Sequence, residues 1–162
     1  ETFHVSPEYL QDMEGEQEEV NLYDYGIQLT RSFRALKLWM SLKVFGLAAF
    51  RQAVTHGLNL ARIAEDKLKE MSRWEIITPA QMGVVTFRYV PKNLSPEATD
   101  TFNRELVAPI VADGFALVVS TIIKNRTVLR FCTINPRTTE EDIGQVIKKL
   151  DQSAQEQTAN WK

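Results

Sequence analysis

The longest regular pattern in this sequence is a helical repeat of apolar side chains between residues 47 and 71. Steps of three or four residues separate its members, which are Leu47, Phe50, Val54, Leu58, Ala61, Ala64, Leu68 and Met71. Because such steps place side chains on one face of an α-helix, and polar side chains occupy the opposite face, the pattern predicts a long amphipathic helix. Gly57 lies within it at a cost of about 1 kcal/mol relative to alanine, which favours close packing at that position.

A second helical pattern comes before this one. It begins near Ser32, and its apolar positions are Phe33, Leu36, Trp39, Met40 and Val44. Gly46 interrupts the run between the two patterns. Residues 1 to about 24 are polar and contain an acidic run, so they are interpreted as a solvated or mobile loop.

Segments rich in β-branched and aromatic residues predict four strands. They are residues 74–77, 84–90, 115–123 and 127–134, with residues 78–83 as a connection between the first two. The last two strands are separated only by residues 124–126, which is short enough for a hairpin.

Two more helices are predicted among and after the strands. Ser95, Pro96 and Glu97 are typical of a helix start, with serine as the cap and proline at the first helical position. Pro109 lacks an amide donor and should bend or shorten this helix before Asp113 and Gly114 end it. Its inward side chains are predicted to be Phe102, Leu106, Ile110 and Val111.

The last helix is predicted to start at a capping-box pattern over residues 138–141. In this interpretation Glu140 and Glu141 are helix-capping acids and not a catalytic pair. The inner stripe of the helix is Ile143, Val146, Ile147 and Leu150. The polar tail after about Gln152 is expected to fray.

The predicted order is helix, helix, strand, strand, helix, strand, strand, helix, and no internal repeat is seen. Hairpin-length connections then favour an antiparallel sheet with helices packed on one face. This arrangement belongs to the α+β fold class.

Composition argues against several functions. The net charge is -2 with no basic stripe, which argues against nucleic-acid binding, and no apolar run reaches the length of a membrane span. No secretory signal pattern or Cys/His zinc cluster is seen. The single cysteine, Cys132, cannot form an internal disulfide, which fits a reducing compartment such as the cytoplasm. It lies in a predicted buried strand without a neighbouring histidine, so we do not interpret it as a nucleophile.

Three blocks of sequence carry a resemblance to a known family: Ser6 to Leu10, Tyr25 to Gly46, and Val128 to Ile143. Through them the chain resembles the group II pyridoxal-phosphate-dependent amino-acid decarboxylases, which include aromatic L-amino-acid decarboxylase. The resemblance runs from Ser6 to about Leu150. It implies the C-terminal small domain of a fold-type I enzyme together with the segment that joins it to the large cofactor domain.

The resemblance also implies a division of the chain. Residues 1–24 would form a mobile catalytic loop, residues 25–46 a helix linking to the large domain, residues 47–152 the small C-terminal α+β domain, and residues 153–162 a polar tail.

Tyr9 matches the family's catalytic-loop tyrosine, which closes over the active site, commonly that of the partner subunit. Loss of carbon dioxide leaves an α-carbon that must be protonated, and a phenol within hydrogen-bond reach can donate that proton. Relatives that make aldehydes oxidatively typically carry phenylalanine here, so Tyr9 favours simple decarboxylation.

Two further positions are implied to contact the substrate. Gly46 matches a position that lines the aromatic pocket of plant relatives, where glycine resembles the indole-accepting members; a helix break is the alternative interpretation. Arg130 lies mid-strand, and the matching arginine of glutamate-type relatives lies near the substrate carboxylate. Because a buried arginine needs a partner, a structural ion pair across the domain junction is the alternative for Arg130.

The family holds its cofactor as an imine on a lysine that follows a histidine. Neither His4 nor His56 is followed by lysine, and Lys37 and Lys43 lack the preceding histidine. The resemblance therefore implies that pyridoxal 5'-phosphate is bound mainly by a large domain supplied by another chain or segment.

These observations predict part of a carboxy-lyase that is inactive alone, acts on an aromatic L-amino acid and works in a homodimer-like assembly. The alternative is a non-catalytic interaction or regulatory module derived from the same domain. In that case the helix face that docks on the large domain would be exposed and need another cover.

Overall fold

The computed structural model describes Tyr25, Ile27 and residues 32–161. The chain divides after Val44 into two units, Glu1–Val44 and Phe45–Lys162, and each is considered by itself. In the first unit the described helical residues run from Arg34 to Val44, at the start of helix α1 (Arg34–Lys69). The predicted loop over residues 1–24 lies outside the described residues.

Helix α1 is interrupted where the sequence predicts it. Gly46 has φ 78° and ψ 155°, so the backbone leaves the helical conformation at this residue. A positive φ with an extended ψ is a conformation that essentially only glycine adopts without strain. The predicted interruption at Gly46 is therefore confirmed.

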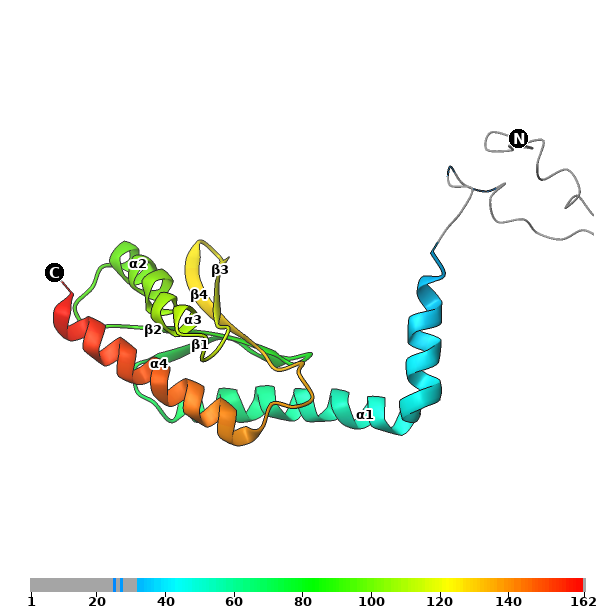
Figure 1. Ribbon diagram of the computed structural model, residues 1–162. Helices are drawn as coiled ribbons and strands as arrows, with labels where there is room; N and C mark the ends of the chain where they lie inside the picture. Colours follow the sequence, from blue (N-terminus) through cyan, green and yellow to red (C-terminus); the bar gives the residue numbers. More distant parts are fainter. Residues whose placement is uncertain (1–24, 26, 28–31, 162) are drawn as a thin grey trace, which may run out of the picture. The chain divides into compact units, whose positions relative to one another are not determined.

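The second unit contains a four-stranded antiparallel sheet in the order β1-β2-β4-β3 (Figure 1). Its strands are β1 (Trp74–Gln81), β2 (Val84–Tyr89), β3 (Val119–Ile123) and β4 (Arg126–Cys132). The two central strands pair with Val85 opposite Phe131 and Phe87 opposite Leu129. These four side chains share one face of the sheet and form the middle of the core.

Helices cover that face. Residues of α1, α2 (Pro96–Leu106), α3 (Ala108–Ala112) and α4 (Glu140–Asn160) join the same core cluster. The start of α4 lies next to the end of α1 (Figure 1), where Lys67 Nζ is 3.5 Å from Glu140 Oε1. The buried helical side chains include Leu60, Leu68, Phe102, Leu106, Ile147 and Leu150. The predicted α+β fold, an antiparallel sheet with helices on one face, is confirmed.

Strand β1 is longer than predicted. The sequence interpretation ended it at Ile77, but it continues to Gln81 and contains Pro79. β1 lies at the edge of the sheet, where a proline does not remove a ladder hydrogen bond. Side chains satisfy the irregular backbone, since Thr86 Oγ1 accepts from Thr78 N at 3.0 Å and Glu65 Oε2 accepts from Ala80 N at 2.7 Å.

Strand β3 is shorter than predicted. Residues 115–118 were expected to belong to it, but it begins at Val119. Phe115 N instead donates to Asp113 Oδ1 at 2.9 Å, a local turn that competes with strand pairing. Strand β4 likewise begins at Arg126 and ends at Cys132, against the expected 127–134.

The proline-containing helix divides into two. α2 ends at Leu106 and α3 starts at Ala108, with Pro109 in its first turn, so the predicted shortening is confirmed. The inward assignment of Val111 is wrong, because this side chain is 40% exposed, whereas Ile110 is fully buried.

The expected fraying after Gln152 is also wrong. α4 continues to Asn160, Ala154 is fully buried, and the ring of Trp161 lies 5.1 Å from that of Phe102. An apolar residue at each of these two positions, within an otherwise polar segment, fixes the end of the helix to the core.

Candidate functional site

The three residues expected to act on the substrate have different outcomes. Tyr9 lies outside the described residues. Gly46 is the break in α1, and an added Cβ would meet nothing within 4 Å among the described residues. This backbone supports the helix-break interpretation of Gly46, and its assignment to a substrate pocket remains a prediction.

Arg130 is exposed, so the sequence-based picture of a buried arginine is wrong. Its strand neighbours are Thr86 on β2 and Val119 on β3. Its side chain alternates with those of Leu129 and Phe131, so it lies on the face of the sheet opposite the core. Within the described residues no ion pair joins Arg130 to a carboxylate.

Other charged side chains share this outer sheet face. Arg88 Nη2 lies 3.1 Å from Asp100 Oδ1, and Arg126 Nη2 lies 2.6 Å from Glu75 Oε2. Arg88 and Glu75 are cross-strand partners. Asp100 belongs to α2, so the strands themselves contribute Arg88, Arg126 and Glu75 to this face beside Arg130.

Cys132 also lies on the face of the sheet opposite the core. The expectation that it lies in a buried strand is wrong for the side chain, which is exposed. Strand alternation explains the difference, because Phe131 and Thr133 on either side are buried. Among residues 32–161, with Tyr25 and Ile27, no group of three His, Cys, Asp or Glu side chains could hold a metal ion.

The start of α4 is capped one residue later than predicted. Thr139 is the N-cap, and its side chain accepts from Asp142 N at 3.1 Å while Asp142 Oδ2 accepts from Thr139 N at 2.7 Å. The Thr139 hydroxyl also donates to Asp142 Oδ2 at 2.8 Å, and the bonds that Asp142 Oδ2 accepts, first from the backbone and then from the side chain of Thr139, lower the pKa of Asp142. Glu140 and Glu141 occupy the first turn, as the sequence indicates.

A pyridoxal phosphate site needs a lysine positioned in a pocket to form the imine. None of the described lysines is buried. Lys67, Lys69 and Lys149 are ion-paired with Glu140, Glu65 and Asp113. The remaining described lysines are exposed: Lys37, Lys43, Lys92, Lys124 and Lys148. The structure therefore singles out none of the described lysines as the residue that forms an imine.

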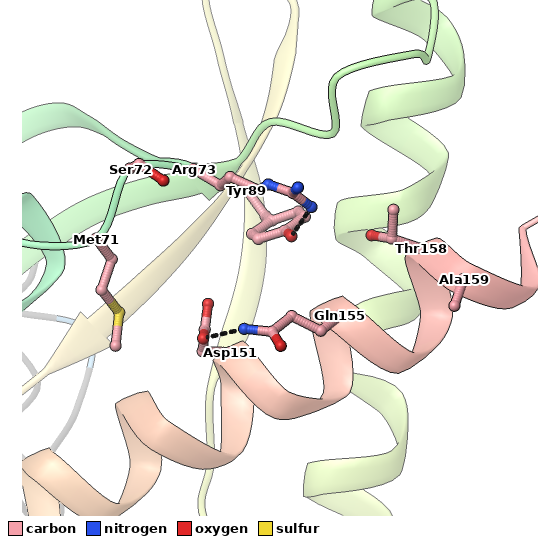
Figure 2. A pocket seen from close by; sticks show the side chains of 8 residues that line it. All are labelled: Met71, Ser72, Arg73, Tyr89, Asp151, Gln155, Thr158 and Ala159. Carbon is pink, nitrogen blue, oxygen red and sulfur yellow. Dashed lines mark hydrogen bonds between the residues drawn. The ribbon is translucent and has the colours of Figure 1, made fainter.

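The structure also contains a groove that the sequence did not reveal. It has a volume of about 610 Å³ and lies between the turn after α1, the end of β2 and the outer part of α4 (Figure 2). Its lining residues are Met71, Ser72, Arg73, Tyr89, Asp151, Gln155, Thr158 and Ala159. Arg73 and Asp151 stand 78 positions apart in the sequence, so no local motif could have signalled their meeting.

Comparison with known proteins decides the family. Residues 1–90 match the family model described as the pyridoxal-dependent decarboxylase conserved domain. The chain belongs to this decarboxylase family. It is 46% identical over 162 residues to the aromatic-L-amino-acid decarboxylase of Bacillus atrophaeus, covering 99% of this chain and 34% of that protein. It is 31% identical over 157 residues to tyrosine decarboxylase 2 of Arabidopsis thaliana, covering 96% of this chain and 29% of that protein.

Solved structures of decarboxylases match the fold. The TDC of Oryza sativa, crystallised with PLP and tryptamine, superimposes with a TM-score of 0.82 at 27% identity, covering 96% of this chain and 33% of that chain. A decarboxylase domain from Vibrio parahaemolyticus gives a TM-score of 0.69 at 25% identity, covering 78% of this chain and 27% of that chain. The predicted small domain of a fold-type I enzyme is confirmed, and this chain spans about a third of the length of the relatives it matches.

Proposed function

We propose that this chain is the part of an amino-acid decarboxylase that supplies the proton donor, while the rest of the enzyme supplies the cofactor lysine. The observation that carries the proposal is the match to the decarboxylase family, together with described lysines that are all exposed or ion-paired. The cofactor in this proposal is pyridoxal 5'-phosphate, which provides the electron sink for loss of carbon dioxide.

Tyr9 is proposed as the catalytic residue. After the carboxyl group has left, its phenol donates a proton to the α-carbon and is then reprotonated from solvent. A tyrosine phenol has an ordinary pKa near 10, so it is protonated and available as a donor at neutral pH. This assignment rests on the family resemblance of the segment from Ser6 to Leu10.

The proposed substrate is an aromatic L-amino acid. Support comes from the 46% identity to an aromatic-L-amino-acid decarboxylase and from the fold shared with a protein crystallised with tryptamine. Gly46 and Arg130 are the proposed substrate-binding residues. Arg130 has an exposed guanidinium that forms no ion pair within the described residues, so it is available to a carboxylate. We propose a homodimeric enzyme of the cytoplasm.

The alternative is a non-catalytic interaction module. The observation that favours it is a set of apolar side chains exposed just before α1 and on its first part. They are Phe33, Leu38, Trp39, Met40 and Val44, each more than half exposed. A cluster of this kind indicates a surface that another protein covers.

A chimera tests the proposed function. This chain would replace the third of the Bacillus atrophaeus aromatic-L-amino-acid decarboxylase that it matches, and carbon dioxide release from L-tryptophan, L-tyrosine and L-phenylalanine would be measured. The enzyme proposal predicts release by the chimera and none by the 162-residue chain alone. Absence of release from a folded, pyridoxal-phosphate-loaded chimera would favour the interaction module.

The cofactor arrangement has its own test. The purified chain, mixed with pyridoxal phosphate, is expected to show no imine absorbance band that borohydride removes. Borohydride reduction that fixes pyridoxal phosphate to one defined lysine of this chain would contradict the proposal that the imine-forming lysine comes from elsewhere.

A further inference from the structure

We propose that the groove between the turn after α1, β2 and α4 binds a small zwitterion of the α-amino-acid class. This inference goes beyond the proposed function and does not depend on it. All the residues involved belong to the second unit of the chain, and Gly46 and Arg130 do not line the groove.

The charge of the lining is the first argument. Of its eight residues, Arg73 is the one cation and Asp151 the one anion. Figure 2 shows these two side chains on opposite walls. Within the described residues no ion pair within 4.0 Å joins Arg73 to Asp151, or either of them to another charged group. Opposite charges that face one groove without pairing are complementary to a ligand that carries both charges.

The positive wall is held in place. Arg73 Nη1 donates to Tyr89 OH at 3.1 Å, and the Tyr89 residue is fully buried between core side chains. A guanidinium has five N–H donors, so one bond to Tyr89 leaves an edge that can bind a carboxylate in a bidentate manner. Arg73 is only partly buried, which keeps that edge accessible from the groove.

The negative wall is held as firmly. Asp151 Oδ1 accepts from Trp74 Nε1 at 2.9 Å, and Asp151 Oδ2 accepts from Gln155 Nε2 at 2.6 Å. An ionised carboxylate has about four lone-pair positions, so it can still accept from an ammonium group. Trp74 is 6% exposed and belongs to the core, so Asp151 is anchored to a rigid element.

Size and the remaining lining fit the same ligand class. A volume of about 610 Å³ lies within the ordinary range for small-molecule sites. Met71 and Ala159 offer apolar contacts to a side chain, while Ser72 and Thr158 add hydroxyl groups. A simple anion such as phosphate would meet the Asp151 carboxylate in the same groove, so the zwitterion is favoured over it.

The test is an NMR titration of the 162-residue chain without cofactor. The indole N–H signal of Trp74 reports directly on Asp151, and Trp39→Phe and Trp161→Phe variants identify it among the three tryptophans. The probes are L-phenylalanine, 3-phenylpropionate and 2-phenylethylamine, which share one ring and differ in charge. We expect a saturable shift with L-phenylalanine and at least about tenfold weaker binding of each single-charge analogue, because each lacks one charge-assisted hydrogen bond.

Variants complete the design. Arg73→Gln and Asp151→Asn should each weaken L-phenylalanine binding at least about tenfold, Arg73→Lys should weaken it less, and Arg104→Gln on the exposed side of α2 should leave it unchanged. If Arg73→Gln fails to fold, as its ligand-free spectrum would show, Arg73→Lys and Asp151→Asn carry the comparison. Equal binding of the three probes, undiminished binding in the groove variants, or no shift up to the solubility limit would each overturn the proposal. The decarboxylase proposal would stand in every one of these cases, because no cofactor or turnover is involved.

Discussion

Gly57 is the residue at which the backbone of α1 comes closest to the segment after β4. A Cβ atom added there would lie 2.6 Å from the backbone oxygen of Thr133, which is closer than such atoms approach each other. Thr133 Oγ1 also lies 2.7 Å from Gly57 O and 3.0 Å from Gly83 O, and its single hydrogen is shared between these two acceptors. The close packing expected from a glycine inside a helical pattern is therefore confirmed at Gly57.

This contact predicts a stability change of opposite sign at two helical glycines. Gly57→Ala should lower the free energy of unfolding by about 1–3 kcal/mol, because the methyl group must displace backbone. Gly144→Ala in α4 should raise it by about 0.5–1 kcal/mol, because an added Cβ meets nothing within 4 Å and alanine favours the helix. Urea unfolding measures both. Equal effects of the two substitutions would contradict the close approach at Gly57.

Glu65 is a carboxylate on α1 with two partners. Lys69 Nζ lies 2.6 Å from Glu65 Oε1, and Ala80 N donates to Glu65 Oε2. The hydrogen bond from Lys69, followed by that from Ala80, lowers the pKa of Glu65. Because the folded state favours the ionised form, this stabilisation is complete above the ordinary pKa of glutamate and is lost as the pH falls through the lowered pKa.

Glu65→Gln should therefore destabilise the chain at pH 7 and have a smaller effect in acid. The difference in unfolding free energy between the native chain and Glu65→Gln is expected to shrink between about pH 5 and pH 3. Denaturant unfolding at several pH values measures it, with the exposed Asp66→Asn as the control. A difference that stays constant over this pH range would show that the charge of Glu65 plays no part.

At the scale of elements, the sequence predicted those whose signals are local. The helical repeat of α1, the break at Gly46 and the cap of α2 at Ser95 all depend on neighbouring residues, and the structure agrees with each. The wrong predictions concern residues whose environment depends on how distant segments of the chain pack together. Pro79 belongs to a strand because β1 is at an edge, and Arg130 is exposed because of the face it occupies. The groove could not be predicted, since its walls come from distant parts of the chain.

The end of α4 gives a prediction about an element whose extent the sequence missed. Trp161→Ala removes the contact with Phe102 and should cost about 1–3 kcal/mol of stability. Asn160→Ala, at the adjacent exposed position, is the matched control and should change stability little. Thermal unfolding distinguishes them. Identical melting temperatures of Trp161→Ala and the native chain would restore the expectation of a frayed tail.

The break in α1 at Gly46 gives a second prediction about an element. In the chimeric enzyme, Gly46→Ala and Gly46→Ser should lower the melting temperature alike, at a cost of about 1–3 kcal/mol, because both place a Cβ at φ 78°. The pocket interpretation makes a different prediction. In that case Gly46→Ser also changes the ratio of kcat/KM for tryptophan and tyrosine, while Gly46→Ala changes this ratio less.

At the scale of the whole molecule, the second unit of the chain has a hydrophobic core of its own. Fully buried side chains come from every layer of the second unit, from Leu60 on α1 to Leu150 on α4. The catalytic chemistry is proposed to be divided, with Tyr9 on this chain and the cofactor lysine on the rest of the enzyme. None of the helices in the described part of the chain is long and apolar enough to cross a membrane. We therefore propose that this chain contains a folded domain whose catalytic contribution depends on the rest of the enzyme.

The products formed by a Tyr9→Phe variant of the chimera test this account most directly. Amine, aldehyde and oxygen consumption would be measured with L-tryptophan, and Tyr23→Phe, which removes a second phenol from the same N-terminal segment, is the matched control. If Tyr9 protonates the α-carbon, Tyr9→Phe loses most amine formation and shifts toward aldehyde with uptake of oxygen, while Tyr23→Phe makes amine at the rate of the unsubstituted chimera. Undiminished amine formation by Tyr9→Phe would contradict the claim that this chain supplies the proton.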